Sequence, residues 1–303
     1  MARSKVGLAL ASVALAVLLA SMAAALAAKP SAGQTAVAVT LVGAGDISRC
    51  DNKGDTATAR LVASIPGTVF TAGDNAYQEG TLWQFRNCYD PTWGRFKART
   101  KPTVGNHEYR TSGASGYFNY FGASAGEPGK GYYSYNRGAW HIIALNSECA
   151  YVQGGGCDPG SEMLTWLKND LTAHPSRCTL AYFHKPLFSS GYSHGNNPEV
   201  KPLWNALYAA HADVVISGHD HVYERFARQT PSGALDTRGI REFVVGTGGA
   251  ELGGFNTVQP HSQVRNANTH GVLKLRLDSA SYSWKFVHVA GKTFTDSGTT
   301  SCS

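Results

Sequence analysis

The segment at residues 213–225, "DVVISGHDHVYER", constrains the fold most, because an apolar run ends there in a glycine and two histidines. Its β-branched residues predict a buried strand. His219 and His221 are two positions apart, and such side chains point to the same side of an extended chain. Neutral imidazole is a common metal ligand. The segment therefore predicts a pair of metal ligands just beyond a buried strand.

Strand-like and helix-like stretches alternate along most of the chain. The expected strands cover residues 38–45, 68–73, 101–107, 140–146, 179–184 and 213–219, and the expected helices cover 55–65, 161–174 and 198–211. After residue 225 the pattern is mostly β. We therefore predict an α/β protein, a four-layer α/β/β/α sandwich of two mixed β-sheets flanked by helices.

Polar side chains of the kind that bind metals follow nearly every predicted strand. We expect the metal ligands to be Asp46, Asp74, Tyr77, Asn106, His184, His219 and His221. In open α/β sheets the site lies beyond the carboxyl ends of the strands, so these residues should meet at one edge. Mixed oxygen and nitrogen donors suit Fe, Mn or Zn. The set exceeds the needs of one ion, and with a bridging carboxylate it predicts two.

The motifs GD, GDxxY, GNHE, a lone strand-end histidine and GHDHxYER occur in that order from about residue 39 to 225. This series resembles the calcineurin-like metallophosphoesterases, and within them the purple acid phosphatase branch. The resemblance implies a first metal held by Asp46, Asp74, Tyr77 and His221, with Asp74 bridging. It implies a second metal completed by Asn106, His184 and His219.

The same resemblance implies two catalytic histidines and a metal pair. His107 would contact the phosphate or the leaving group, and His194, in "FSSGYSHGNN", would face the substrate. Many relatives have a metal-binding histidine where this chain has Ser48, and Tyr77 compensates in the purple branch. Because a tyrosinate favours a hard trivalent ion, we expect Fe(III) plus a divalent ion, which is Fe, Zn or Mn.

The predicted function is that of an exported binuclear-metal phosphatase, which hydrolyses phosphate monoesters by attack of a metal-activated hydroxide. His107 or His194 would protonate the leaving oxygen. The alternatives are a phosphodiesterase or nucleotidase on the same metals, and a non-catalytic metal- or phosphate-binding protein. Asp220 and Glu108 are either acceptors for the ligand imidazoles or simple loop carboxylates.

The expected partner is a small phosphorylated substrate, and the sequence leaves the oligomeric state open. The basic cluster at residues 95–101 is interpreted as a solvated helix face, so no nucleic-acid partner is expected. Residues 109–130 are rich in Gly, Ser, Tyr and Asn and predict a long loop. The aromatic residues within that segment either pack in the core or line the substrate pocket.

The N-terminus predicts export. Basic residues and an Ala-rich apolar stretch precede Ala25-Leu26-Ala27, so we expect a signal peptide at 1–27. The alternative is an uncleaved membrane anchor, whereas cleavage leaves no stable anchor. The expected division continues with a linker at 28–36, a metallophosphoesterase core at 37–228 and a β-rich part at 229–303 that completes the same domain. The expected localisation is secreted or extracytoplasmic.

Six cysteines in an exported chain predict disulfides. Sequence alone does not select among the possible pairings, and we expect Cys50–Cys88, Cys149–Cys157 and Cys178–Cys302. A cysteine-ligated zinc is the alternative, but the CxxC spacing typical of such sites is absent from the sequence.

Overall fold

The computed structural model describes Met1 and residues 37–303. The predicted signal peptide, apart from Met1, and the predicted linker therefore lie outside the described residues. The division at residues 228 and 229 stays a prediction. None of the helices within 37–303 has the length and apolar character needed to cross a bilayer.

Two mixed sheets form the centre of the fold. The first sheet has the order β13-β12-β11-β1-β2-β3 and consists of β1 (Val39–Ala44), β2 (Thr68–Ala72), β3 (Thr100–Thr103), β11 (Gly271–Leu277), β12 (Ser281–His288) and β13 (Ser297–Ser301). The second has the order β10-β8-β9-β7-β6-β5-β4 and consists of β4 (Tyr133–Arg137), β5 (Trp140–Ala144), β6 (Cys178–Tyr182), β7 (Val214–Ser217), β8 (Tyr223–Phe226), β9 (Arg241–Val245) and β10 (Ser262–Asn266). Strands β1, β2 and β3 run parallel, as do β5, β6, β7 and β9.

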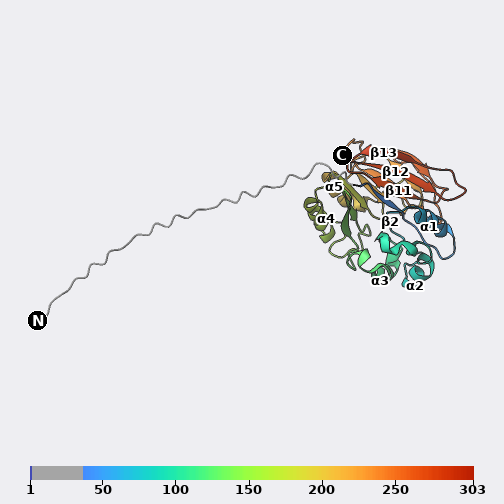
Figure 1. The fold of residues 1–303 in the computed structure, drawn as a ribbon, viewed down its shortest axis with the longest axis horizontal. Helices are drawn as coiled ribbons and strands as arrows, with labels where there is room; N and C mark the ends of the chain where they lie inside the picture. The colour runs from blue at the N-terminus through green and yellow to red at the C-terminus, as the bar shows by residue number, and fades with distance from the viewer. Residues whose placement is uncertain (2–36) are drawn as a thin grey trace. The chain divides into compact units, whose positions relative to one another are not determined.

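The alternation of side chains along the buried strands produces the layers. In β7, Val214 and Ile216 belong to the core cluster that joins both sheets, whereas Val215 belongs to the cluster beneath α4 (Glu162–Ala173) and α5 (Lys201–Ala209). Helix α1 (Gly54–Ser64) packs against β11 and β12 of the first sheet. The predicted four-layer α/β/β/α sandwich is therefore confirmed (Figure 1).

The segment predicted as a long loop is largely helical, so that prediction was wrong. It contains α3 (Ser115–Phe121) and short 3-10 turns, while α2 (Leu82–Gln84) precedes it in the chain. Tyr117, Tyr120 and Phe121 are buried and pack around Phe85. Burial of these rings stabilises a helix that the Gly- and Ser-rich composition does not predict.

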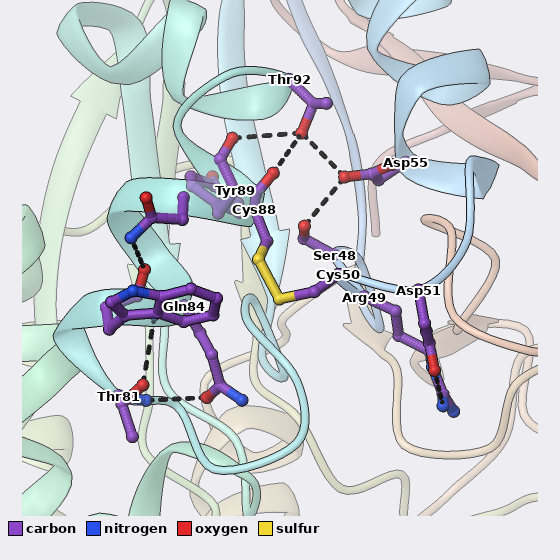
Figure 2. Close-up of a disulfide and its surroundings, with 12 residues drawn as sticks. Ser48, Arg49, Cys50, Asp51, Asp55, Thr81, Gln84, Cys88, Tyr89 and Thr92 are labelled. Carbon is purple, nitrogen blue, oxygen red and sulfur yellow. Dashed lines mark hydrogen bonds and ion pairs between the residues drawn. A yellow bond between two sulfur atoms is a disulfide. The ribbon is translucent and has the colours of Figure 1, made fainter.

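All three expected disulfides are present. They join Cys50 to Cys88, Cys149 to Cys157 and Cys178 to Cys302. Figure 2 shows the first of them, which ties the loop after β1 to the helical turn at Phe85–Tyr89. The third links the C-terminal residues to the start of β6.

Candidate metal centre

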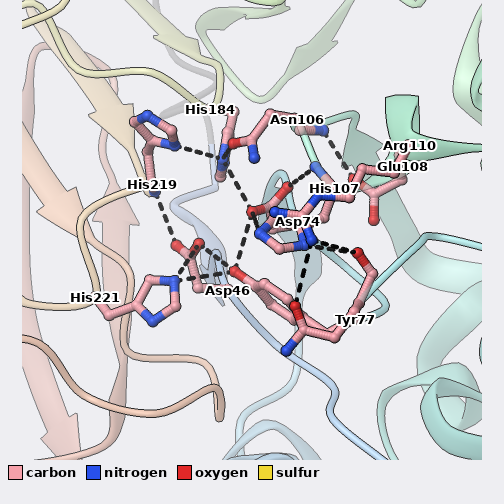
Figure 3. Close-up of polar contacts among 12 residues, drawn as sticks. Asp46, Asp74, Tyr77, Asn106, His107, Glu108, Arg110, His184, His219 and His221 are labelled. Carbon is pink, nitrogen blue, oxygen red and sulfur yellow. Dashed lines mark hydrogen bonds and ion pairs between the residues drawn. The ribbon is translucent and has the colours of Figure 1, made fainter. Parts of the chain in front are cut away.

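The predicted ligands lie on the loops that leave β1, β2, β3, β6 and β7, and these loops meet at one edge of the two sheets (Figure 3). Three of the ligands have left-handed backbone conformations, with φ of 59° at Asp46, 47° at Asp74 and 71° at His219. Asp and His tolerate this region better than most residues. A side chain at Gly218 would lie 2.5 Å from the Asp46 carboxylate, so this glycine provides space.

A first cluster of donor atoms surrounds the Tyr77 hydroxyl. Its Oη lies 2.8 Å from Asp46 Oδ1, 3.0 Å from Asp74 Oδ2 and 3.0 Å from His221 Nε2. The other nitrogen of His221, Nδ1, lies 2.6 Å from the Glu251 carbonyl oxygen, to which it can donate its proton. The Nε2 lone pair then faces the oxygens. A phenol donates a single hydrogen, so a cation at this position would relieve the crowding of lone pairs.

A second cluster surrounds the His184 imidazole. Its Nε2 lies 3.0 Å from Asn106 Oδ1, 3.1 Å from His219 Nδ1 and 3.3 Å from Asp74 Oδ2. The His184 Nδ1 lies 2.8 Å from the Ala72 carbonyl oxygen, which fixes the ring with its Nε2 lone pair toward the cluster. Asp74 Oδ2 is common to both clusters. The structure thus brings together all the predicted ligands.

The buried charges require a compensating positive charge. Asp46, Asp74 and His184 are at most 2% exposed, and one donor atom from each lies within 4.8 Å of the others. Burial alone would lower the pKa of His184, but the Asp74 carboxylate raises it to about 10. Burial, with Asp46 and Asp74 beside it, raises the pKa of Tyr77 well above its usual value. Protons can supply the missing charge, and so can metal ions, which suit this oxygen and nitrogen donor set.

The Ser48 side chain points away from the clusters. Its Oγ donates to Asp55 Oδ2 at 2.8 Å, and Thr92 Oγ1 donates to the same oxygen at 2.9 Å (Figure 2). Ser48 is fully buried, so this bond satisfies a hydroxyl that has no access to water. Tyr77 contributes the donor atom at this side of the site.

The two predicted catalytic histidines lie beside the clusters. The His107 backbone N–H donates to Asp74 Oδ1 at 2.9 Å, and its Nε2 lies 3.8 Å from Asp74 Oδ2. The His194 ring stacks on His219 with centroids 3.8 Å apart. Burial lowers the pKa of both His107 and His194, which favours their neutral forms. Each imidazole therefore lies next to a predicted metal ligand, His107 next to Asp74 and His194 next to His219.

The hypothesis that Asp220 and Glu108 accept bonds from ligand imidazoles was wrong. Asp220 accepts bonds from the backbone N–H groups of His194 and Gly195, at 3.1 and 3.0 Å, so it holds the His194 loop. Glu108 accepts bonds from backbone N–H groups on the loops that carry Asp74 and Asn106.

The acceptors that orient the ligand imidazoles are backbone carbonyls, at Ala72 for His184 and at Glu251 for His221. Sequence reasoning missed them because every residue has a carbonyl group, so no residue type indicates which one is used. Their identity depends on how the strands and the turn after β9 are placed around the site.

The calcineurin-like phosphoesterase family model matches residues 41–223, so this chain belongs to that family. Its curated relatives include purple acid phosphatase 15 of Arabidopsis thaliana, 28% identical over 68% of this chain and 44% of the relative. Phosphoenolpyruvate phosphatase of Allium cepa is 28% identical over 72% of this chain and 51% of the relative. The chain thus spans about half the length of these curated relatives.

Solved structures share the fold. The purple acid phosphatase PPD1 of yellow lupin, Lupinus luteus, superposes with a TM-score of 0.72 at 19% identity, over 88% of this chain and 54% of that one. GAP50 of Plasmodium superposes with a TM-score of 0.67 at 17% identity, over 86% of this chain and 88% of that one. The branch expected from the motifs agrees with these comparisons.

Proposed function

We propose that this protein is an exported phosphatase that hydrolyses phosphate monoesters at a binuclear metal centre. The observation that carries the proposal is the position of Asp74 Oδ2, which lies 3.0 Å from Tyr77 Oη and 3.3 Å from His184 Nε2. One carboxylate oxygen is thereby common to two groups of converging donors. Membership in a family with purple acid phosphatase relatives supports a dinuclear centre.

In this proposal Asp46, Asp74, Tyr77 and His221 hold one ion, and Asp74, Asn106, His184 and His219 hold the other. When bound, two such ions neutralise the phosphate charge and lower the pKa of a water molecule that attacks phosphorus. Tyr77 favours Fe(III) at the first position, with Fe, Zn or Mn at the second.

The chain's own imidazoles would supply the proton for the leaving group. His107 is fixed by its backbone bond to Asp74, and its Nδ1 lies 2.7 Å from the Gln78 carbonyl oxygen. His194 is fixed by the bond from its backbone N–H to Asp220. A phosphate between the two clusters would lie near both rings, and either could protonate the leaving oxygen as a general acid.

Export is part of the proposal because of the disulfides. Three cross-links within one chain are typical of proteins that fold in an oxidising compartment. The predicted signal peptide agrees with this environment.

The test is metal analysis by mass spectrometry and a visible spectrum on the same sample, followed by assays with phenyl phosphate and diphenyl phosphate. We expect about two ions per chain, one of them iron with a tyrosinate band, and faster turnover of the monoester. A metal-loaded protein that prefers the diester would replace the monoesterase with a phosphodiesterase. A protein that takes up no metal, even when ions are added, would exclude both.

A further inference from the structure

Within residues 37–303, the cationic residues close in the chain to the predicted ligands include Arg49, Lys185 and Arg110, and the first two are neutralised. Arg49, directly after Ser48, forms two bonds to Asp51 at 2.9 and 2.8 Å. Lys185, directly after His184, lies 2.7 Å from Glu199 Oε1 and 3.2 Å from Glu148 Oε2. Both charges already have close carboxylate partners.

Arg110 differs because its head group is loosely held. Its Nη1 lies 3.4 Å from the Gln78 carbonyl oxygen and 3.5 Å from Gln78 Oε1, which are long hydrogen bonds. The nearest carboxylate oxygen, Glu79 Oε1, is 3.8 Å away, and both side chains are about half exposed. Such an exposed ion pair contributes little, so the guanidinium is available to another anion.

The backbone beneath this loose head group is fixed. Arg110 belongs to the short 3-10 helix Glu108–Arg110, and its N–H donates to the His107 carbonyl. Glu108 is fully buried and binds backbone N–H groups at Asn75, Ala76 and Gly105. Because this backbone is already fixed, the conformational entropy lost on binding a ligand would be confined to the Arg110 side chain.

The position of Arg110 relates it to the substrate. Arg110 Nη1 and His107 Nδ1 converge on one acceptor, the Gln78 carbonyl oxygen, while His107 Nε2 faces Asp74 (Figure 3). The Arg110 guanidinium therefore shares an acceptor with the His107 ring, and that ring lies beside Asp74. A substrate with its phosphate at the two clusters would reach Arg110 by extending past His107.

We propose that Arg110 determines substrate specificity by binding a second anionic group, a carboxylate or a second phosphate, carried near the phosphate that is hydrolysed. The inference rests on the proposed function for the location of the phosphate. A guanidinium binds both kinds of anion in a bidentate manner, which a half-exposed Arg can adopt without displacing a strong partner.

The test uses ligands that bind but are not hydrolysed, with hydrolysis measured separately. Phosphonoacetate and propylphosphonate have similar size and differ in one carboxylate, and their affinities for the metal-loaded protein are measured by calorimetry. We expect the wild type to bind phosphonoacetate about tenfold more tightly, as one charge-assisted bond allows. Arg110→Gln should reduce this preference to within about twofold and leave propylphosphonate binding unchanged. Arg110→Lys should restore part of it.

The matched control is Arg276→Gln. Arg276 is also exposed. It lies on β11 opposite Thr40 of β1, near the start of β1, whereas Asp46 follows the other end of β1. This variant should keep the full preference, whereas Glu79→Gln should increase it by removing a competing carboxylate. If Arg110→Gln retains the preference, or weakens both ligands equally, the inference is overturned. A metal-loaded wild type that does not hydrolyse phenyl phosphate, yet shows the Arg110-dependent preference, would refute the phosphatase while supporting the anion site.

Discussion

Asp74 Oδ2 lies 3.0 Å from the Tyr77 hydroxyl, and on its other side the same oxygen faces His184 Nε2 at 3.3 Å. In the proposed centre Asp74 would be a ligand of both ions. We expect Asp74→Ala to lose both ions and to reduce hydrolysis by more than about 100-fold. Substitution of a residue that only supports the metal ligands typically costs up to about 100-fold, and the loss of a ligand should cost more. Metal analysis by mass spectrometry checks the first effect and steady-state kinetics the second. Asp278→Ala, at a partly exposed residue directly after β11, is the control. Full activity of Asp74→Ala would contradict the two-metal centre.

Tyr77 is proposed to bind Fe(III), so its hydroxyl should be the source of any purple colour. Tyr77→Phe removes this oxygen and keeps the ring, which packs against His107 with centroids 4.3 Å apart. We expect the visible charge-transfer band to disappear while hydrolysis persists, because three other residues still hold that ion. The spectrum is compared with that of Tyr192→Phe, an exposed tyrosine. A variant that keeps the band would show that Tyr77 is not the ligand.

His194 is expected to act on the substrate and not on the metal. His194→Ala should lower kcat by about 100-fold, the lower range for general acid–base catalysis, with metal content unchanged. His211→Ala, an exposed histidine after α5, should leave both quantities unchanged. If His194→Ala loses metal, the residue is a ligand, and if kcat is unaffected, it has no catalytic role.

Asp296 predicts a pH dependence of stability. Burial opposes its ionisation, but bonds from Arg225 at 2.7 Å and Tyr223 at 2.8 Å outweigh that effect and lower its pKa. A carboxyl group with a depressed pKa stabilises the fold above its unfolded pKa, near 3.8, and loses this contribution as pH falls through the folded pKa. We expect Asp296→Asn to lower the free energy of unfolding by about 1–3 kcal/mol near neutral pH.

The measurement is urea unfolding of the wild type and Asp296→Asn at neutral pH and at a pH below 3.8. The difference in free energy of unfolding between the wild type and Asp296→Asn should be smaller at the acidic pH. Asp278→Asn, which removes an exposed pair with Arg276, is the control and should differ little from the wild type. A difference that is the same at both pH values would mean that Asp296 does not stabilise the fold through its charge.

Much of the fold and site could be predicted from the sequence, because the relevant constraints are local. Strand periodicity placed Val214–Ser217, and the N-cap at Ser161 placed α4, where the Ser161 side chain accepts a bond from the Leu164 N–H. His219 and His221 were expected to point to the same side of an extended chain, but His219 has a left-handed φ of 71°. The two imidazoles therefore belong to different clusters, His221 beside Tyr77 and His219 beside His184. The two sheets agree with the predicted architecture, although the helix α3 was missed because its stability comes from packing against Phe85.

The sequence by itself determined which kinds of donor atom this protein has and the order in which its strands deliver them. Only the tertiary structure decided that Asp74 Oδ2 is shared, that Ser48 binds Asp55, and that Asp220 holds the His194 loop. The physical reason is that donor types and side-chain alternation are properties of short segments. The convergence of atoms from distant segments depends on sheet register and on packing between layers, which no short segment specifies.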